Sequence, residues 1–128
     1  MRLINPGAGD YADRLTILTL KLLFGEAAGK ETTHFRNERN VLITKLAGRE
    51  LTSAAMEALL DLAVVNAALW HAEDDLRHAR PTDPREGINA VLVADLAIRI
   101  QELNDQRATL RQTINKELGD HLGEEKLT

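Results

Sequence analysis

One stretch in the middle of the chain places polar groups within an apolar helical stripe. At about 100° per residue, Asn66, Glu73 and Arg77 fall on one face of a helix, and Leu69 and Trp70 flank them. Burying an amide, a carboxylate and a guanidinium costs several kcal/mol unless they find partners. Either other helices supply those partners or a ligand does.

A second polar group falls on a later apolar stripe. Apolar residues recur every three or four positions over 93–114, and Arg107 is the charged member, with Asn104 and Arg111 beside it. We expect these side chains to satisfy those of the earlier stripe. Glu73 facing Arg107 is the first pairing to consider, because a bidentate carboxylate and guanidinium pair can stay buried and fix the register of two helices.

The short connection between the two stretches argues against this direct contact. Reflection about a turn centred near residue 83 leaves Glu73 about 21 Å short of Arg107 at the helical rise. The contact requires a long irregular connection over 80–92. The wheel positions still predict that both side chains are substantially buried.

The alternative is a site for a small anionic ligand, since cations outnumber carboxylates along these stripes. A phosphate or carboxylate held by arginine forks is the natural partner if Asp13, Asp74 and Asp105 do not compensate. Trp70 would then floor the pocket, although a lone tryptophan on a helix face more often packs in a core. The candidate ligand-binding residues are Arg14, Lys21, Arg39, Asn66, Trp70, Glu73, Arg77, Asn104, Arg107 and Arg111.

Other site chemistry has little support in the residue pattern. The four histidines form no tight ligand array, so we expect no metal site and no cofactor. No serine, lysine or thiol nucleophile stands out, so no catalytic residue is assigned and enzyme activity stays open.

Composition sets the class of protein. A chain of 128 residues is expected to be a single domain spanning 1–128, and the absence of cysteine favours the cytoplasm. A net charge of −4 with four aromatic residues argues against nucleic-acid binding. The closest approach to a membrane span is 15–24, which is short and contains Lys21, so we expect no membrane insertion.

The elements that must position these residues are all helices. Residues 1–9 resemble an extended arm, and 120–128 a charged tail that frays. Caps and glycine stops predict an all-α antiparallel bundle of about four helices, dominated by a hairpin of the third and fourth, with the first packed into its groove. The first expected helix runs over 11–24, between a cap at Asp10 and a stop at Gly25. The second runs from Thr32 or Thr33 to 47, and the third from Thr52 or Ser53 to about 79. The fourth has a start signal at Asp83-Pro84-Arg85-Glu86, becomes regular from Val93 and ends at Gly119.

Two helices carry features that need an explanation beyond the bundle. The first is apolar around most of its circumference, so we expect a homodimer with this helix near the interface. On the second, Arg39 shares a side with apolar residues, which an arginine achieves by laying its stem along them and exposing its head.

Three segments together resemble a known family. They are Asp13-Arg14-Leu15-Thr16-Ile17-Leu18 with Lys21, then Asn66-x-x-Leu69-Trp70-x-x-Glu73-Asp74-x-x-Arg77, and then Asn104-Asp105-x-Arg107 with Arg111 and Ile114-Asn115. In order and spacing this pattern is similar to that of small bacterial helical proteins catalogued only as domains of unknown function. The resemblance implies that these polar residues are a family signature, and it implies no activity. Two functions stay open: an interaction or assembly module whose polar seam sets helix register, and a binding site or enzyme for a small anion.

Overall fold

The computed structural model describes residues 7–79 and 89–119, and in these ranges every regular element is a helix. The helices are α1 (Ala8–Ala27), α2 (Thr33–Ala47), α3 (Ser53–Ala79) and α4 (Ala90–Glu117). The predicted all-α class is therefore confirmed.

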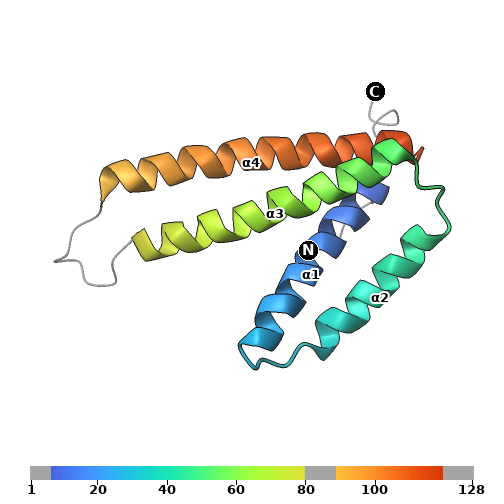
Figure 1. Cartoon of the computed structure of the whole chain (residues 1–128), viewed down its shortest axis with the longest axis horizontal. Coiled ribbons are helices and arrows are strands. Elements are labelled where there is room, and N and C mark those ends of the chain that lie inside the picture. Colours follow the sequence, from blue (N-terminus) through green and yellow to red (C-terminus); the bar gives the residue numbers. More distant parts are fainter. Residues whose placement is uncertain (1–6, 80–88, 120–128) are drawn as a thin grey trace.

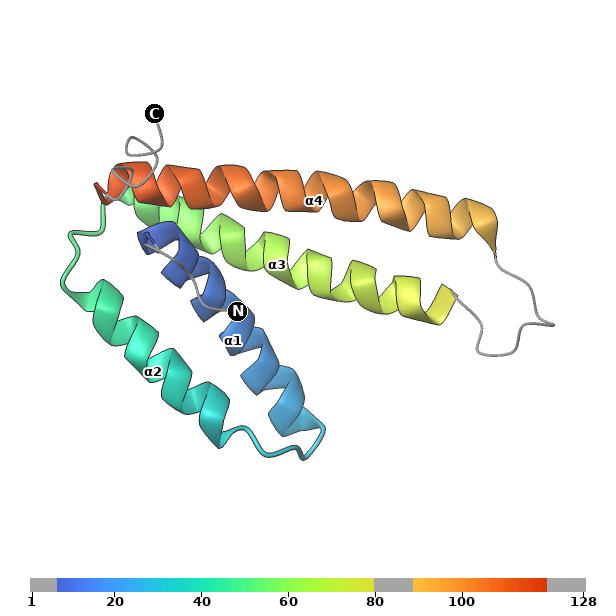
Figure 2. The same ribbon diagram turned by 180° about the vertical axis from the view of Figure 1, so that it is seen from behind.

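The two long helices, α3 and α4, form an antiparallel hairpin with the most extensive contact in the molecule (Figure 1). α1 lies against both of them over one half of the hairpin and then diverges, so the other half consists of α3 and α4 alone (Figures 1 and 2). The backbone of α2 lies against α1 and, within the described ranges, does not come close to α3 or α4. The expected packing of the first helix into the hairpin groove is thus observed.

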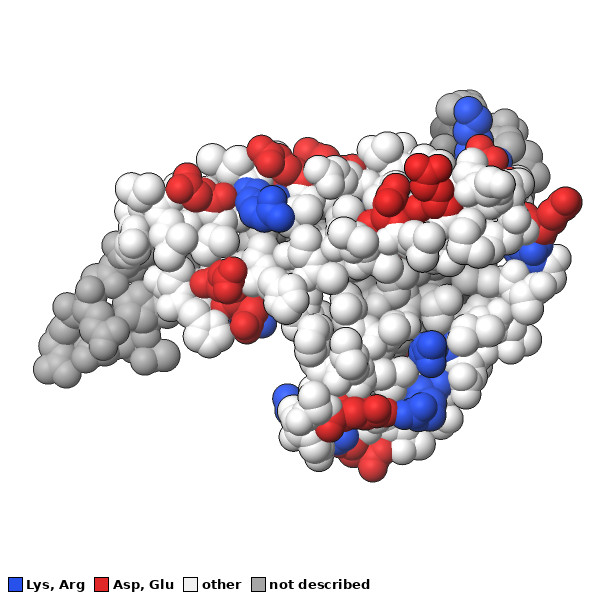
Figure 3. All heavy atoms as spheres, viewed as in Figure 1, with Lys and Arg blue, Asp and Glu red and all other residues white. Residues whose placement is uncertain are grey.

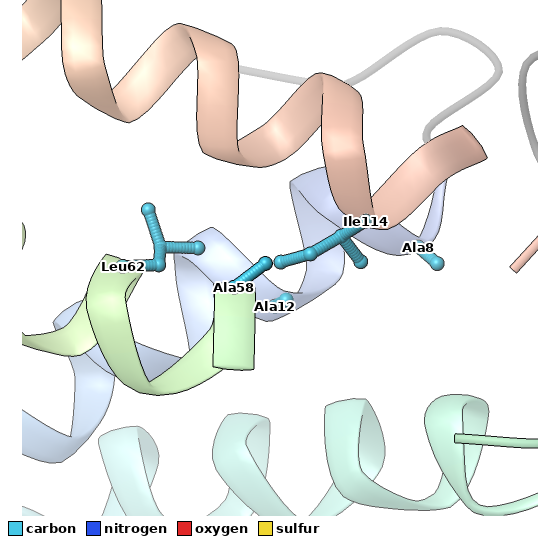
Figure 4. Packing of buried hydrophobic residues seen from close by; sticks show 5 residues of the cluster. All are labelled: Ala8, Ala12, Ala58, Leu62 and Ile114. Carbon is cyan, nitrogen blue, oxygen red and sulfur yellow. The ribbon is translucent and has the colours of Figure 1, made fainter. Parts of the chain in front are cut away.

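The core at this crossing uses small side chains. Ala8 and Ala12 of α1 meet Ala58 and Leu62 of α3 and Ile114 of α4, and all five are buried (Figure 4). Three alanines let three helices approach closely, while Ile114 and Leu62 fill the space between them. A second cluster, built by Val65, Leu69, Ala72 and Leu103, continues along the hairpin.

Gly9 marks the closest approach of α1 to α4. A Cβ atom added there would lie 2.2 Å from the backbone carbonyl oxygen of Arg111. The Gly9 amide instead donates a 2.7 Å hydrogen bond to Oδ1 of Asn115. Glycine is required here because the two backbones leave no room for a side chain.

α1 is longer at both ends than the capping pattern predicted. It begins at Ala8, so residues 8 and 9 do not belong to an extended arm, and residues 1–6 lie outside the described ranges. Asp10 lies in the first turn of the helix and is not its cap, and its Oδ2 accepts the Gly7 amide at 3.0 Å. Gly25 does not stop the helix, which continues to Ala27, and the left-handed turn of the chain comes at Gly29 with φ +72°.

The ends of α4 can be compared with the prediction only in part. The 83–86 start signal and the 120–128 tail both lie outside the described residues. In the described part, Asn89 precedes the first turn, and its Oδ1 accepts the Leu92 amide at 3.1 Å. At the other end Gly119, with φ +75°, follows the helix as predicted.

α3 comes closer to the composition of a membrane span than residues 15–24, the segment chosen from the sequence. Among the described residues it is the one helix long and apolar enough, by length and composition, to cross a membrane, with a mean hydropathy of 1.3 in its most apolar window. In this fold 33% of that window is buried, where α3 packs against α1 and α4.

Candidate functional site

The polar seam is centred on Asp13, a residue of α1 that is 4% exposed. Arg107 of α4 reaches it with two hydrogen bonds, from Nε to Oδ1 at 2.8 Å and from Nη2 to Oδ2 at 2.6 Å. This is the bidentate arrangement in which a guanidinium and a carboxylate interact most strongly. The predicted buried ion pair of Arg107 therefore exists, but with a different carboxylate.

Asn66 ties the third helix to the same carboxylate. Its Nδ2 donates to Oδ1 of Asp13 at 2.9 Å and to Oγ1 of Thr16 at 2.7 Å, and the Thr16 hydroxyl donates to the Asp13 carbonyl at 2.8 Å. Asn66 is itself 4% exposed. The Asn66 side-chain amide thus donates two hydrogen bonds to α1, and the Asp13 carboxylate joins α1, α3 and α4.

Arg107 is partly open to solvent, with a side chain 28% exposed. Its pKa is raised, first by the hydrogen bonds to Asp13 and further by the charges of Asp13 and Glu73, while burial opposes the shift. The Arg107 guanidinium is therefore held in its charged form.

Arg107 pairs with Asp13 and not with Glu73, in line with the argument from the short connection against that contact. The predicted burial of Glu73 is wrong, because Glu73 is exposed. Asn66 and Arg107 lie level because both reach Asp13. Glu73 is seven residues farther along α3, which is about 10 Å at the helical rise. From that distance it acts on Arg107 only through its charge.

The outer members of the predicted seam are also exposed. Arg77 and Asn104 lie on the surface. Arg77 donates to Oδ1 of Asp74, one turn back on the same helix, at 3.1 Å. α1 lies beside the other half of the hairpin, so at the Arg77 end of α3 no described helix covers the face that the helical wheel marked for burial (Figure 1).

Most of the apparent excess of cations is neutralised by carboxylates of the chain. Arg14 forms a bidentate pair with Glu38 of α2, at 2.9 and 3.1 Å. Arg111 Nη1 lies 3.9 Å from Asp10 Oδ1 and 3.8 Å from Asp13 Oδ2.

Two further candidates, Lys21 and Trp70, lie against aromatic rings. The Lys21 ammonium is 5.2 Å from the centre of the Phe35 ring. The Trp70 ring is 5.2 Å from that of Phe24, so it helps to hold the end of α1 against α3.

Arg39 is the exception among the candidate cations. Its Nε is buried without a hydrogen-bond partner, and its guanidinium forms no ion pair with the described residues. The side chain borders a groove between α1, α2 and α3. From the sequence we expected the charged end of Arg39 to be exposed, but its Nε is buried.

Asp13 is the central residue of this network, and the helical wheel did not single it out. In the sequence it was a possible counter-charge and a member of the first segment of the family resemblance. A signal was present in the small residues that precede it, Gly9 and Ala12, which indicate close contact with other helices on that side of α1.

The geometry of this seam is that of a closed polar network. Hydrogen bonds within the chain join Asp13 to Thr16, Asn66 and Arg107, and Asn66 to Thr16. Among the described residues, no group of three His, Cys, Asp or Glu side chains is placed to hold a metal ion. Comparisons with models of protein families, with curated proteins and with solved structures give no match for this chain.

Proposed function

We propose that this chain is a helical assembly module, whose polar network at Asp13 fixes how α1 sits on the hairpin and whose outer surfaces bind another protein chain. The observation that carries the proposal is a contrast. The buried side chains of Asp13 and Asn66 are hydrogen-bonded within the chain, while large apolar side chains remain exposed, among them Leu23 at 62% and Val64 at 68%. Apolar surface of this kind marks sites of protein association.

The register role follows from the geometry of the network. A carboxylate that takes donors from two other helices loses them if any of the three slides by one turn, and a buried charge without partners costs several kcal/mol. Hydrophobic side chains alone are less selective, because they pack acceptably in several alignments.

The register role is tested by replacing the network with apolar residues of similar size. The chain has no cysteine, so spin labels can be attached at cysteines introduced on exposed positions, for example Thr19→Cys on α1 and Gln112→Cys on α4. We expect one narrow distance distribution in the parent and a broad or split one after Asp13→Leu, Asn66→Leu and Arg107→Met. An unchanged narrow distribution in a folded variant contradicts the register role.

The matched control leaves the seam intact. Arg14→Met with Glu38→Leu removes an exposed ion pair of the same chemistry. The distance distribution between the labels should stay narrow in this variant, because the exposed pair does not join α1 to α4.

The proposed module is a homodimer with α1 near the interface. Support comes from Leu23, exposed on α1, and from Leu20, which borders the groove described above. Light scattering at micromolar concentration tests this, and a monomeric mass contradicts it. The resemblance to bacterial proteins and the lack of cysteine support a cytoplasmic bacterial setting.

A small-anion site is the second candidate, and Arg39 is the observation that favours it. Thermal-shift measurements with nucleotides, sugar phosphates and small carboxylates test it. A ligand at a hundred times its dissociation constant adds about 2.7 kcal/mol to the free energy of unfolding. We expect any such shift to disappear in Arg39→Ala, and a shift that persists there places the ligand elsewhere.

A further inference from the structure

An apolar groove runs between α1, α2 and α3. It consists of two adjoining hollows, of about 250 and 210 Å³, whose linings share Leu15, Ile43 and Leu59. The groove is open because the α2 backbone approaches α1 and not α3 within the described ranges. Helices form its walls, and no other described residue covers its open side.

Arg39 stands on the α2 wall of this groove. Its buried Nε has no acceptor, and no carboxylate of the described residues pairs with its guanidinium. A buried donor is normally satisfied by some partner. The Nε itself is closed off from solvent, but the Arg39 side chain as a whole is partly exposed, so a carboxylate brought in over the groove would pair with the guanidinium.

The opposite wall ends in an exposed ridge on α3. Met56, Leu60 and Val64 recur every four residues along it and are 44%, 60% and 68% exposed. Glu57 and Asp61 follow on the side of this ridge that faces away from the groove, and both are exposed. A small anion in the groove would leave this ridge uncovered, whereas a protein surface covers both.

Charge is divided between the two halves of the chain. Residues 1–47 hold seven basic and five acidic side chains, a net charge of 7 − 5 = +2, and residues 48–128 hold nine and fifteen, a net charge of 9 − 15 = −6. On the face drawn in Figure 3, most acidic side chains lie over the α3–α4 hairpin, and a group of basic ones lies over α2. The α2 side of one copy and the α3 side of another are therefore complementary.

We infer that a second copy of this chain packs its α3 ridge, defined by Met56, Leu60 and Val64, against the same ridge of the first, so that its Glu57 side covers this groove and sets Glu57 against Arg39. A two-fold axis running roughly parallel to α3, beside the ridge, places Glu57 of each copy against Arg39 of the other. Rotation about it brings the two ridges face to face and exchanges their flanks, so that the Glu57 side of each copy lies over the groove of the other. Both Arg39 side chains gain a carboxylate, as a closed isologous interface demands.

This inference rests on the proposed homodimer and is tested by exchanging the two charges. Light scattering and sedimentation give the mass of the parent, of Arg39→Glu, of Glu57→Lys and of the double variant. We expect a dimer for the parent, a dimer dissociation constant raised at least tenfold in each single variant, and recovery in the double variant. Arg99→Glu and Glu102→Lys are matched controls on exposed α4 positions and should leave the mass unchanged.

Cross-linking provides a second measurement that needs no charge change. Since the chain has no cysteine, Leu60→Cys introduces a single thiol beside the inferred axis. A short bismaleimide should join two copies of this variant and should not join Val91→Cys, which is exposed at the far end of the hairpin.

The outcomes separate the inference from the proposed homodimer. A parent that dimerises while both single variants keep its affinity, or while Leu60→Cys does not cross-link, overturns the docking of α3 and leaves the homodimer standing. A parent that is monomeric at micromolar concentration overturns both. Circular dichroism of each variant checks that a loss of dimer is not a loss of fold.

Discussion

Asp13 and Arg14 are neighbours in the chain, yet they belong to two regions of opposite character. Asp13 faces the crossing of α1 with the hairpin and is bonded to Asn66 and Arg107 in a buried network. Arg14 faces α2 and forms a geometrically similar pair with Glu38, but these two side chains are 39% and 43% exposed. The number of hydrogen bonds does not distinguish the two pairs. Burial does, because water screens and competes with the second pair and not with the first.

The largest effect should come from removing the carboxylate at the crossing. Asp13→Ala leaves Asn66 and the partly buried Arg107 without their acceptor, and we expect a loss of about 3 kcal/mol in the free energy of unfolding by urea denaturation. Asp13→Asn keeps one acceptor oxygen and should cost less. A loss under about 0.5 kcal/mol for the alanine variant, as at an ordinary surface site, would show that the two regions do not differ.

Close packing of α1 on α4 should give the next largest effect. Gly9→Ala forces the new Cβ against the Arg111 carbonyl, so we expect a destabilisation of about 1 to 3 kcal/mol. Gly48→Ala is the matched control, since its Cβ would meet nothing within 4 Å and its φ of −82° suits alanine. Equal effects in the two variants would mean that α1 does not approach α4 as closely as described.

Double-mutant cycles compare the two ion pairs directly. For Asp13 and Arg107 we expect a coupling energy of about 1.5 to 3 kcal/mol, and for Arg14 and Glu38 one of about 0.2 to 1 kcal/mol. The single substitution Glu73→Ala should lower the free energy of unfolding by under about 0.5 kcal/mol, because Glu73 is exposed. A strong coupling of Glu73 with Arg107 would restore the pairing that the structure argues against.

The smallest effect concerns pH at the α1–α2 surface. The hydrogen bond from Arg14 lowers the pKa of Glu38 below its ordinary value of 4.5. A carboxylate with a lowered folded pKa contributes stability above its unfolded pKa and loses it as pH falls through the folded one. Titration of the Glu38 carboxyl by NMR should therefore show its pKa rising toward 4.5 in Arg14→Ala. An unchanged pKa would mean that the pair does not form in solution.

Much of the fold was predictable because it depends on local rules. The helix class, the existence of four helices, the α3–α4 hairpin and the stop at Gly119 all follow from apolar period, capping residues and a short connection. The site was predictable in part. Asn66 and Arg107 were identified as polar residues on apolar stripes, and the structure brings them together at one carboxylate.

The identity of that carboxylate was decided by tertiary structure alone. A helical wheel gives the side of a helix on which a residue lies, but not which neighbour covers that side or for how many turns. Asn66 and Glu73 share one face of α3, but Asn66 is buried against Asp13 of α1, whereas Glu73 is exposed. The sequence by itself determined which polar residues lie on the apolar stripes. The crossing of α1, made possible by Gly9 and the alanines beside it, decided which of them are buried, because only close contact of three helices excludes water from the carboxylate they share.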